Sequence, residues 1–421
     1  MNPLLDASFC IPDVEARVMP DGRLYLYGSM DRPGQKGYCS DQYHVFSTDD
    51  PKLERWVDHG VAFSSEAEHM EGLCPQGTIL YAPDAIYRDG LYYLYFCTSD
   101  NKEGVAVSDT PYGPFHSPRA IPLASGDSID PAVFIDDDGQ AYYFWGQFHL
   151  KGARLNPDMC TLEEGSVCSG ILTEQEHGFH EGASIRKRNG KYYLVYTDIS
   201  RGRATCLGYA MADAPLGPYR KCGILLDNTG CDPQSWNNHG SIEEFNGQWY
   251  VFYHRSSHNG IFSRRVCAEP IFFLPDGTIR EAEQTSGGAG GPLNAYSPIP
   301  AGAACHMTGS CHIRLDAQEG AILSGCGGGA EAAKTGWLKW AEYRELDFGK
   351  GPSFGKITLR GTGTLFFRTT QNRLLGHCTV DSSQFITLSF PTDSSIQGTL
   401  PLWILFDGEG IEVKEMRFFM E

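Results

Sequence analysis

The chain has 421 residues, which is long for one ordinary compact domain and predicts two domains. Its formal net charge of −18 disfavours nucleic acids and anionic membrane surfaces as partners, and no window holds the roughly 18 apolar residues that a membrane span requires. The 49 glycines and the 12% of aromatic residues favour an all-β protein with short strands and tight turns.

Five hairpins of one kind follow each other along residues 6–290. In each, an Asp-Gly or Asn-Gly pair directly precedes an aromatic-rich strand, as in DGLYYLYF at Asp89 and NGKYYLVYT at Asn189. The other copies begin at Asp21, Asp138 and Asn246, so successive turns are 68, 49, 51 and 57 residues apart. Both residues of such a pair tolerate positive φ, as a type I′ hairpin turn requires. A period of about fifty residues with several strands per unit predicts a five-bladed β-propeller.

The position eight residues before each turn carries the candidate chemistry. It is held by Asp13, Tyr81, Asp130, Glu181 and, in the last copy, Asn238, beside His239. The first strand of a propeller blade lies innermost, so we expect these positions to converge at one mouth of the axial channel. Three of them are carboxylates, and hydrolysis of a glycosidic bond requires one carboxylic acid and one carboxylate. A third carboxylate nearby can raise the pKa of the acid by charge repulsion.

The repeat contains five motifs that are specific when taken together. They read PDVEARVMPDGRLYLYGSMD, YAPDAIYRDGLYYLYF, SIDPAVFIDDDGQAYYFWG, HEGASIRKRNGKYYLVYTD and NNHGSIEEFNGQWYVFYHR. Over residues 8–290 they resemble glycoside hydrolase family 43, which implies a five-bladed propeller that hydrolyses glycosides with inversion. The resemblance assigns Asp13 as general base, Asp130 as pKa modulator and Glu181 as general acid. The family usually has proline after the base, whereas Val14 follows Asp13 here, so Glu15 on the same strand face is an alternative base.

Further positions are predicted to contact the sugar. The resemblance gives Arg264 a role in binding sugar hydroxyls, although the doublet with Arg265 leaves the choice open. Tyr81, Trp145 and Trp236 could offer apolar faces to a sugar ring, with ordinary packing as the alternative for each.

Different roles are expected for two histidines near the predicted mouth. The resemblance implies a structural calcium ion near His239, held through water because calcium prefers oxygen ligands; a purely structural histidine is the alternative. No cofactor is expected for the chemistry itself. His180 precedes the predicted acid and is expected to point away from the axis if its strand is regular.

The chain changes texture after the fifth hairpin. Residues 291–304 are rich in glycine and proline and are predicted as a linker between a propeller over 1–290 and a second domain over 305–421. Short alternating segments such as GKITLRG and QFITLSF predict a β-sandwich there. GWLKWAEYRELDFG and PLWILFDGEGIEVKEMRFF are similar to carbohydrate-binding module family 6. Trp337 and Trp340 are candidate sugar contacts, but their spacing in a strand places them on opposite faces, so a domain that braces the propeller is favoured.

The leading hypothesis is an exo-acting glycosidase that removes terminal xylosyl or arabinofuranosyl residues from short plant-derived oligosaccharides. A non-catalytic sugar-binding propeller and a propeller glycosidase acting on galactosyl or fructosyl linkages are the alternatives. The N-terminal residues show no signal-peptide pattern, and the 14 cysteines form no C-x-x-C pair, so a cytoplasmic location is expected. The expected partner is a small oligosaccharide, with no nucleic acid and no membrane, and a homo-oligomer is compatible with the sequence.

Overall fold

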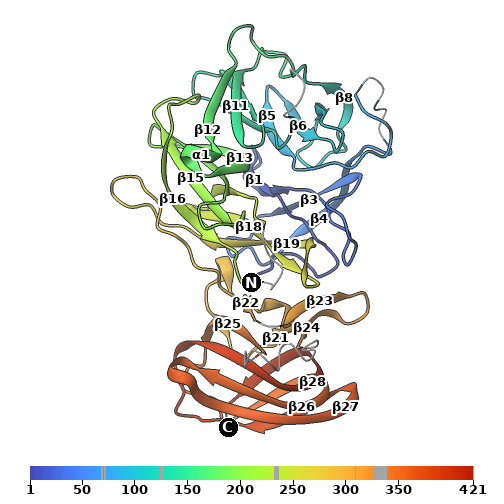
Figure 1. Ribbon diagram of the computed structural model, residues 1–421, viewed down its shortest axis with the longest axis vertical. Coiled ribbons are helices and arrows are strands. Elements are labelled where there is room, and N and C mark those ends of the chain that lie inside the picture. Colours follow the sequence, from blue (N-terminus) through green and yellow to red (C-terminus); the bar gives the residue numbers. More distant parts are fainter. Residues whose placement is uncertain are drawn as a thin grey trace.

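The computed structural model describes residues 1–67, 70, 73–123, 128–231, 237–308, 310–325 and 339–420. Almost all regular structure is strand, in two bodies that follow one another along the chain. Figure 1 shows the strands up to β19 in the upper body and those from β22 onward in the lower one.

The upper body contains five antiparallel sheets, each built from consecutive strands. The first sheet holds β1 (Glu15–Val18), β2 (Leu24–Tyr27), β3 (Gln42–Thr48) and β4 (Val57–Ser64); the second holds β5 (Asp84–Arg88), β6 (Leu91–Cys97), β7 (Glu103–Ser108) and β8 (His116–Ala120). The third holds β9 (Ala132–Ile135), β10 (Ala141–Trp145), β11 (His149–Arg154) and β12 (Cys168–Thr173). After the short helix α1 (Glu174–His177), the fourth holds β13 (Phe179–Arg188), β14 (Lys191–Asp198), β15 (Cys206–Ala212) and β16 (Arg220–Asp227). In the described residues the fifth holds β17 (Ser241–Phe245), β18 (Gln248–Ser257) and β19 (Gly260–Pro270).

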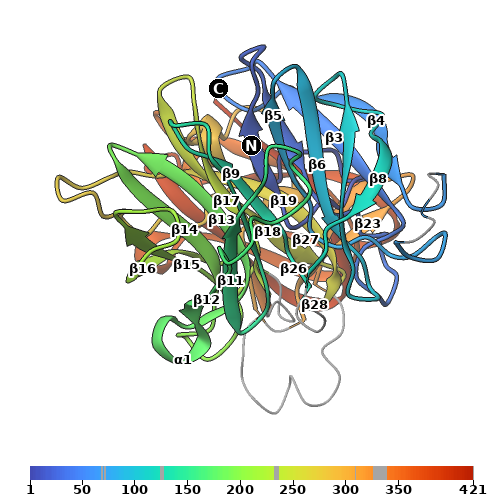
Figure 2. The same ribbon diagram turned by 90° about the horizontal axis from the view of Figure 1, so that it is seen from above.

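The first strand of each sheet lies innermost and contacts the first strands of the two neighbouring sheets. The contacts run from β1 to β5, β9, β13 and β17, and β17 returns to β1. In Figure 2, β9, β13 and β17 lie near the centre, whereas β4 and β16 lie toward opposite edges. The sheets therefore close into a ring, and the five-bladed β-propeller expected from the repeat is confirmed.

The repeated turns agree with the sequence pattern in three blades. Asp89, Asn189 and Asn246 have φ between 50° and 51°, and the glycine after each also has positive φ, as a type I′ turn requires. In the first and third blades only the glycine has positive φ, and the strands there are joined by longer loops. The type I′ expectation is therefore wrong for these two turns, because a longer loop no longer requires two consecutive left-handed residues.

Apolar clusters hold neighbouring blades together. Five clusters in the described part of the chain each combine side chains from two adjacent blades, the last joining the fifth blade to the first. The N-terminal segment strengthens this closure, since the backbone N–H of Leu4 donates to Val266 O of β19 at 2.9 Å. The ring is thus closed by both ends of the propeller sequence.

Charged side chains fill the axis inside the ring. Arg17 binds both carboxylate oxygens of Asp84, with Nε–Oδ1 and Nη2–Oδ2 distances of 3.0 and 2.7 Å. Arg186 joins Glu15 at 2.9 Å and Glu243 at 2.6 Å. These five residues come from β1, β5, β13 and β17, so ion pairs link the innermost strands directly.

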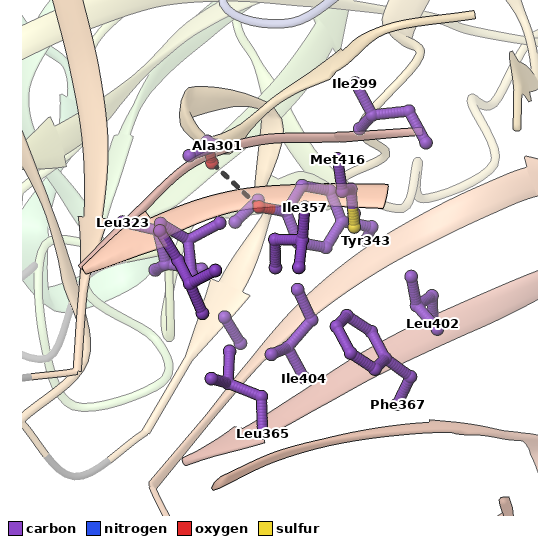
Figure 3. Close-up of a cluster of buried hydrophobic side chains, with 14 of the residues drawn as sticks. Ile299, Ala301, Leu323, Tyr343, Ile357, Leu365, Phe367, Leu402, Ile404 and Met416 are labelled. Carbon is purple, nitrogen blue, oxygen red and sulfur yellow. Dashed lines mark hydrogen bonds between the residues drawn. The ribbon is translucent and has the colours of Figure 1, made fainter. Parts of the chain in front are cut away.

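In the part of the lower body that the structure describes, nine strands form one sheet around a hydrophobic core. Its strands are β20 (Leu293–Asn294), β21 (Ile299–Pro300), β22 (His306–Met307), β23 (His312–Asp316), β24 (Gly320–Ser324), β25 (Lys339–Asp347), β26 (Phe354–Thr369), β27 (Arg373–Pro391) and β28 (Thr399–Phe419). Among the described residues, the 3-10 turns η2 (Ala301–Ala303) and η3 (Thr370–Asn372) accompany them, whereas η1 (Gly288–Gly290) packs against β19 of the propeller. Figure 3 shows the core, where the Tyr343 hydroxyl donates to Ala301 O at 3.0 Å.

Residues 293–300 lie in the stretch predicted as a linker, yet they belong to this sheet. β20 pairs with β25 and β21 pairs with β28. We therefore propose that the second domain begins near residue 293 rather than at 305. Trp340 is half-buried in β25, whereas Trp337 lies outside the described residues.

The β18–β19 hairpin connects the two bodies. At its turn, the backbone N–H of His258 donates to Ile313 O at 2.6 Å, and the ring Nε2 of His258 accepts the N–H of Leu315 at 3.2 Å. The same hairpin carries His254 and Arg264, which reach the candidate active site.

Candidate active site

A cavity of about 280 Å³ lies at the mouth of the axis where the innermost strands begin. Its lining includes all five positions selected by the eight-residue rule: Asp13, Tyr81, Asp130, Glu181 and Asn238. Each comes from a different blade. The structure therefore brings the three predicted carboxylates together at one mouth of the propeller.

Two of the carboxylates stand on the same unusual backbone. Asp13 and Asp130 each lie two residues before the start of an innermost strand, with φ of 57° and 55°. Aspartate tolerates this left-handed conformation better than most residues. At the third carboxylate, Gly182 has φ of 69°, and a Cβ there would lie 2.9 Å from Cδ2 of His239. Glycine thus lets His239 pack directly beside Glu181.

Asp13 is held in its charged form by an arginine. Nη1 of Arg264 donates to Oδ1 of Asp13 at 2.7 Å, and both side chains are buried. Burial by itself raises the pKa of Asp13, but the Arg264 guanidinium outweighs this effect and holds the pKa below its ordinary value. Burial also lowers the pKa of His239 and lowers that of His254 to about 3, so both nearby imidazoles are neutral. Arg264 is therefore the cation that keeps Asp13 ionised.

Asp130 shows the opposite effect, a raised pKa. Burial, together with the negative charges of Glu181 and Asp13, raises the pKa of Asp130 well above its ordinary value. Asp130 therefore favours its protonated form more than an ordinary aspartate does. Nε2 of Gln147 donates to Oε2 of Glu181 at 2.6 Å and fixes that carboxyl group.

Glu15, the alternative base, is not part of the cavity lining. Its carboxylate lies further along the axis and pairs with Arg186 at 2.9 Å. Burial, then the charge of Asp84, raises its pKa to about 7. The geometry favours Asp13 over Glu15 because a base must reach the water beside the substrate.

The predicted aromatic contacts have different outcomes. Tyr81 lines the cavity. Trp145 is 4% exposed and packs with Tyr95 and Tyr143 between the second and third blades. Its predicted sugar contact is therefore wrong, because its strand turns this side chain into the cluster between blades. Trp236 lies outside the described residues.

The structure distinguishes the two adjacent arginines. Arg264 lines the cavity, whereas Arg265 is directed toward the lower body, with Nη1 3.4 Å from the position of a Cβ on Gly302. His180 also lines the cavity, contrary to the expectation that it points away from the axis. The strand is irregular here, with shifts of register on both sides of Glu181, so simple alternation fails.

Three further residues of the cavity had no role in the sequence analysis. Tyr38 lies under the Arg264 guanidinium, 4.8 Å from ring centre to Cζ. Gln147 binds Glu181, and Nδ1 of His254 lies 3.8 Å from Oδ1 of Asp13. Their positions in the repeats could have identified two of them: Gln147 comes just after the aromatic strand of the third repeat, and His254 lies within that of the fifth.

The residues around His239 do not fit a directly coordinated calcium ion. Its Nδ1 lies 3.8 Å from Oδ1 of Asp13 and 4.0 Å from Oδ2 of Asp130. Calcium takes six to eight oxygen ligands, but among the described residues no group of three or more His, Cys, Asp and Glu side chains could hold a metal ion. Asp13 is already paired with Arg264, whose charge disfavours a second cation beside it.

The arrangement can support general acid–base hydrolysis. A carboxylate kept ionised by arginine can accept a proton from water, and a neighbouring carboxyl group in its acid form can donate one to the leaving oxygen. Hydrolysis of a glycosidic bond with inversion uses this combination.

Known proteins show the same fold and related sequences. A xylosidase/arabinosidase from Thermoclostridium stercorarium is 33% identical over 350 residues, covering 73% of this chain and 72% of that protein. The crystal structure of a β-xylosidase/α-arabinofuranosidase from a compost microbial metagenome, in complex with xylotriose, is 32% identical with a TM-score of 0.57, over 67% of this chain and 97% of that one. An arabinoxylan arabinofuranohydrolase from Bacillus subtilis matches 100% of this chain and 97% of its own with a TM-score of 0.58; at 23% identity this shows the fold alone.

The model of the family described as glycosyl hydrolases family 43 matches residues 10–279, which include all five blades. This range covers more than half of the chain and every residue of the candidate site described above. The chain belongs to glycoside hydrolase family 43.

Proposed function

We propose that this glycoside hydrolase removes single terminal xylosyl or arabinofuranosyl residues from short plant-derived oligosaccharides, with inversion of configuration. The observation that carries the proposal is the cavity of about 280 Å³ with Asp13, Asp130 and Glu181 in its lining. A cavity below the usual range for drug-sized ligands suits one sugar unit better than a polymer chain. The activities of the relatives named above support the choice of sugar.

In the proposed reaction, Asp13 accepts a proton from a water molecule as that water attacks the anomeric carbon. Glu181 donates its proton to the departing glycosidic oxygen, so the sugar leaves with the opposite anomeric configuration. Inversion requires room for the water, with the two carboxyl groups roughly 6.5–9.5 Å apart. Arg264 supports this assignment because it keeps Asp13 ionised at the pH of reaction.

Asp130 is proposed to modulate the acid rather than to react. Both residues line the same cavity, and the negative charge of Glu181 raises the pKa of the buried Asp130, so charge repulsion couples the two carboxyl groups. Gln147 donates to Oε2 of Glu181, which leaves Oε1 to carry the proton that is transferred.

The choice of sugar is tested with nitrophenyl glycosides. We expect hydrolysis of the β-D-xylopyranoside, the α-L-arabinofuranoside or both. Release of arabinose without xylose rejects the xylosidase activity, and the reverse result rejects the arabinofuranosidase activity. Activity on galactosyl or fructosyl substrates alone contradicts the proposed substrate class.

The catalytic role of the carboxylates is tested by substitution. Glu181→Gln is expected to abolish hydrolysis of a xylo-oligosaccharide while its binding persists in calorimetry, because the amide keeps the shape but carries no transferable acid proton. A wild-type protein that binds sugar yet cleaves no member of a broad glycoside panel favours the non-catalytic alternative.

Family 43 enzymes need no cofactor for their chemistry, and the steps above use only side chains. A water-mediated calcium ion near His239 stays a prediction, which calcium titration followed by thermal unfolding tests. No helix in the described part of the chain is long and apolar enough to cross a membrane. The cytoplasmic location, the homo-oligomer and sugar binding by the second domain also stay predictions.

A further inference from the structure

Asp31 is a fully buried carboxylate outside the cavity lining. It follows β2 and is separated from Arg264 by 233 residues in the sequence. Its Oδ2 accepts the backbone N–H of Arg264 at 3.0 Å and Nε of the same residue at 2.9 Å. Its Oδ1 accepts Nη2 of Arg264 and the backbone N–H of Cys39, both at 2.9 Å. Both oxygens are therefore bound by two donors each.

Arg264 holds its two carboxylate partners differently. It grips Asp31 through Nε and Nη2 in a two-point contact, whereas it reaches Asp13 only from Nη1 to Oδ1. The guanidinium has fixed planar geometry, so binding one edge to Asp31 determines how the remaining nitrogen faces Asp13. The second carboxylate oxygen of Asp13, Oδ2, is not bound by Arg264.

We propose that Asp31 is a positioning residue for the catalytic base, acting through Arg264. By gripping one edge of the guanidinium, it fixes the direction in which Nη1 faces Asp13, so that Arg264 binds only Oδ1 and the other oxygen of Asp13 is left for the attacking water. Asp31 also neutralises part of the positive charge of Arg264. The pKa of Asp13 is therefore low enough for ionisation but not so low that Asp13 can no longer accept a proton. This role rests on the proposed function, in which Asp13 is the base.

The charged and titratable groups that face Asp13 come from several elements. Arg264 lies on β19, His254 on β18, and His239 just before β17. Asp130, Cys39 and Tyr38 also interact with Asp13 electrostatically. Since burial keeps both histidines neutral, Arg264 is the cation that a change at Asp31 would affect most.

The test is Asp31→Asn in the full chain. Because each carboxylate oxygen accepts two N–H groups, the amide NH₂ meets two donors in either orientation and disrupts the two-point contact. Arg264 then pairs with Asp13 alone. We expect kcat to fall on the order of 100-fold with a smaller change in KM, as for misplaced catalytic groups. The acidic limb of kcat/KM against pH is expected to move to lower pH, because Asp13 loses a repelling negative charge.

Asp84→Asn is a matched control. Asp84 is also fully buried, and each of its oxygens likewise accepts two N–H groups, including a two-point contact from Arg17. It lies in the axial network rather than in the cavity lining, so its substitution is expected to lower stability without changing kcat or the pH profile of the folded enzyme. An equal effect of both substitutions on kcat overturns the proposal.

A double variant keeps the test valid if Asp31→Asn alone fails to fold. Arg264→Met combined with Asp31→Asn removes both charges of the pair, and its kcat is expected to equal that of Arg264→Met alone. A further loss of kcat in the double variant overturns the proposal, as does an unmoved acidic limb or near-normal kcat in Asp31→Asn.

The variant Asp13→Asn separates failure of this inference from failure of the proposed function. If Asp13→Asn retains full activity, the proposed base assignment fails. If Asp13→Asn is inactive while Asp31→Asn behaves as wild type, only the positioning role of Asp31 fails.

Discussion

The axial ion network makes a quantitative prediction about how the propeller is held closed. Asp84 of β5 accepts two N–H groups from Arg17 of β1, at 3.0 and 2.7 Å, and the backbone N–H of Val133 on β9 at 2.8 Å. One buried carboxylate thus joins three blades. Asp84→Asn replaces one carboxylate oxygen with an NH₂ group, which cannot accept hydrogen bonds from the N–H groups that face it. The substitution also leaves Arg17 without its main counter-charge.

The expected loss in the free energy of unfolding depends on the burial of the ion pair and on the charges that remain near Arg17. Removing one partner of a buried ion pair costs about 3–5 kcal/mol. Glu15 offers partial compensation: burial and the Asp84 charge raise its pKa to about 7, so loss of Asp84 favours its ionisation 3.9 Å from Nε of Arg17. We therefore expect the lower end of the range, about 3 kcal/mol, or a fall in Tm of roughly 6 °C.

Urea unfolding at pH 7 measures this loss, with Glu163→Gln as the control variant. Arg154 and Glu163 also form a two-point pair, at 2.6 and 2.8 Å, but both side chains are 41% exposed, so water replaces the lost contact. A loss of stability in Asp84→Asn no larger than that in Glu163→Gln would refute the idea that the axial network holds the blades together.

Three further outcomes are expected. Burial raises the pKa of Glu103 from 4.5 to about 8, so its ionisation destabilises the folded protein as pH rises between these values. Glu103→Gln should therefore reduce the decrease in Tm between pH 5 and pH 8.5. An unchanged decrease in Tm would contradict this prediction. Gln147→Ala removes the 2.6 Å hydrogen bond to Glu181 and should lower kcat roughly 10-fold for poor leaving groups but less for dinitrophenyl glycosides; equal losses would exclude a role on the acid side. His258→Ala removes the acceptor of the Leu315 N–H at the junction of the two bodies and should cost about 1 kcal/mol in urea unfolding, whereas unaltered stability would show that this contact is dispensable.

The sequence repeat was sufficient to predict most of the fold and the main part of the candidate site. A turn pair followed by an aromatic strand is a local signal, and local signals repeated at a regular period predict blades. The position eight residues before the turn placed Asp13, Asp130 and Glu181 at the starts of innermost strands, and all three line one cavity. The rule succeeded because each blade enters the ring in the same way.

The contacts around those carboxylates were not predictable from one sequence. Asp31 and Arg264 are 233 residues apart, and nothing local distinguishes Asp31 from the other acidic residues. Trp145 was misassigned because an aromatic at the end of a blade strand can face either the mouth or the neighbouring blade, and it faces the neighbouring blade. His180 was misassigned because a shift of register beside Glu181 breaks the alternation of side chains.

The proposed mechanism is tested most directly by the stereochemistry of the released sugar. Proton NMR during the first turnovers on the cleaved oligosaccharide identifies the anomer before mutarotation equilibrates it. If Asp13 activates water and Glu181 donates the proton, the first-formed sugar has the anomeric configuration opposite to that of the substrate. A first-formed sugar with the configuration of the substrate would contradict the mechanism.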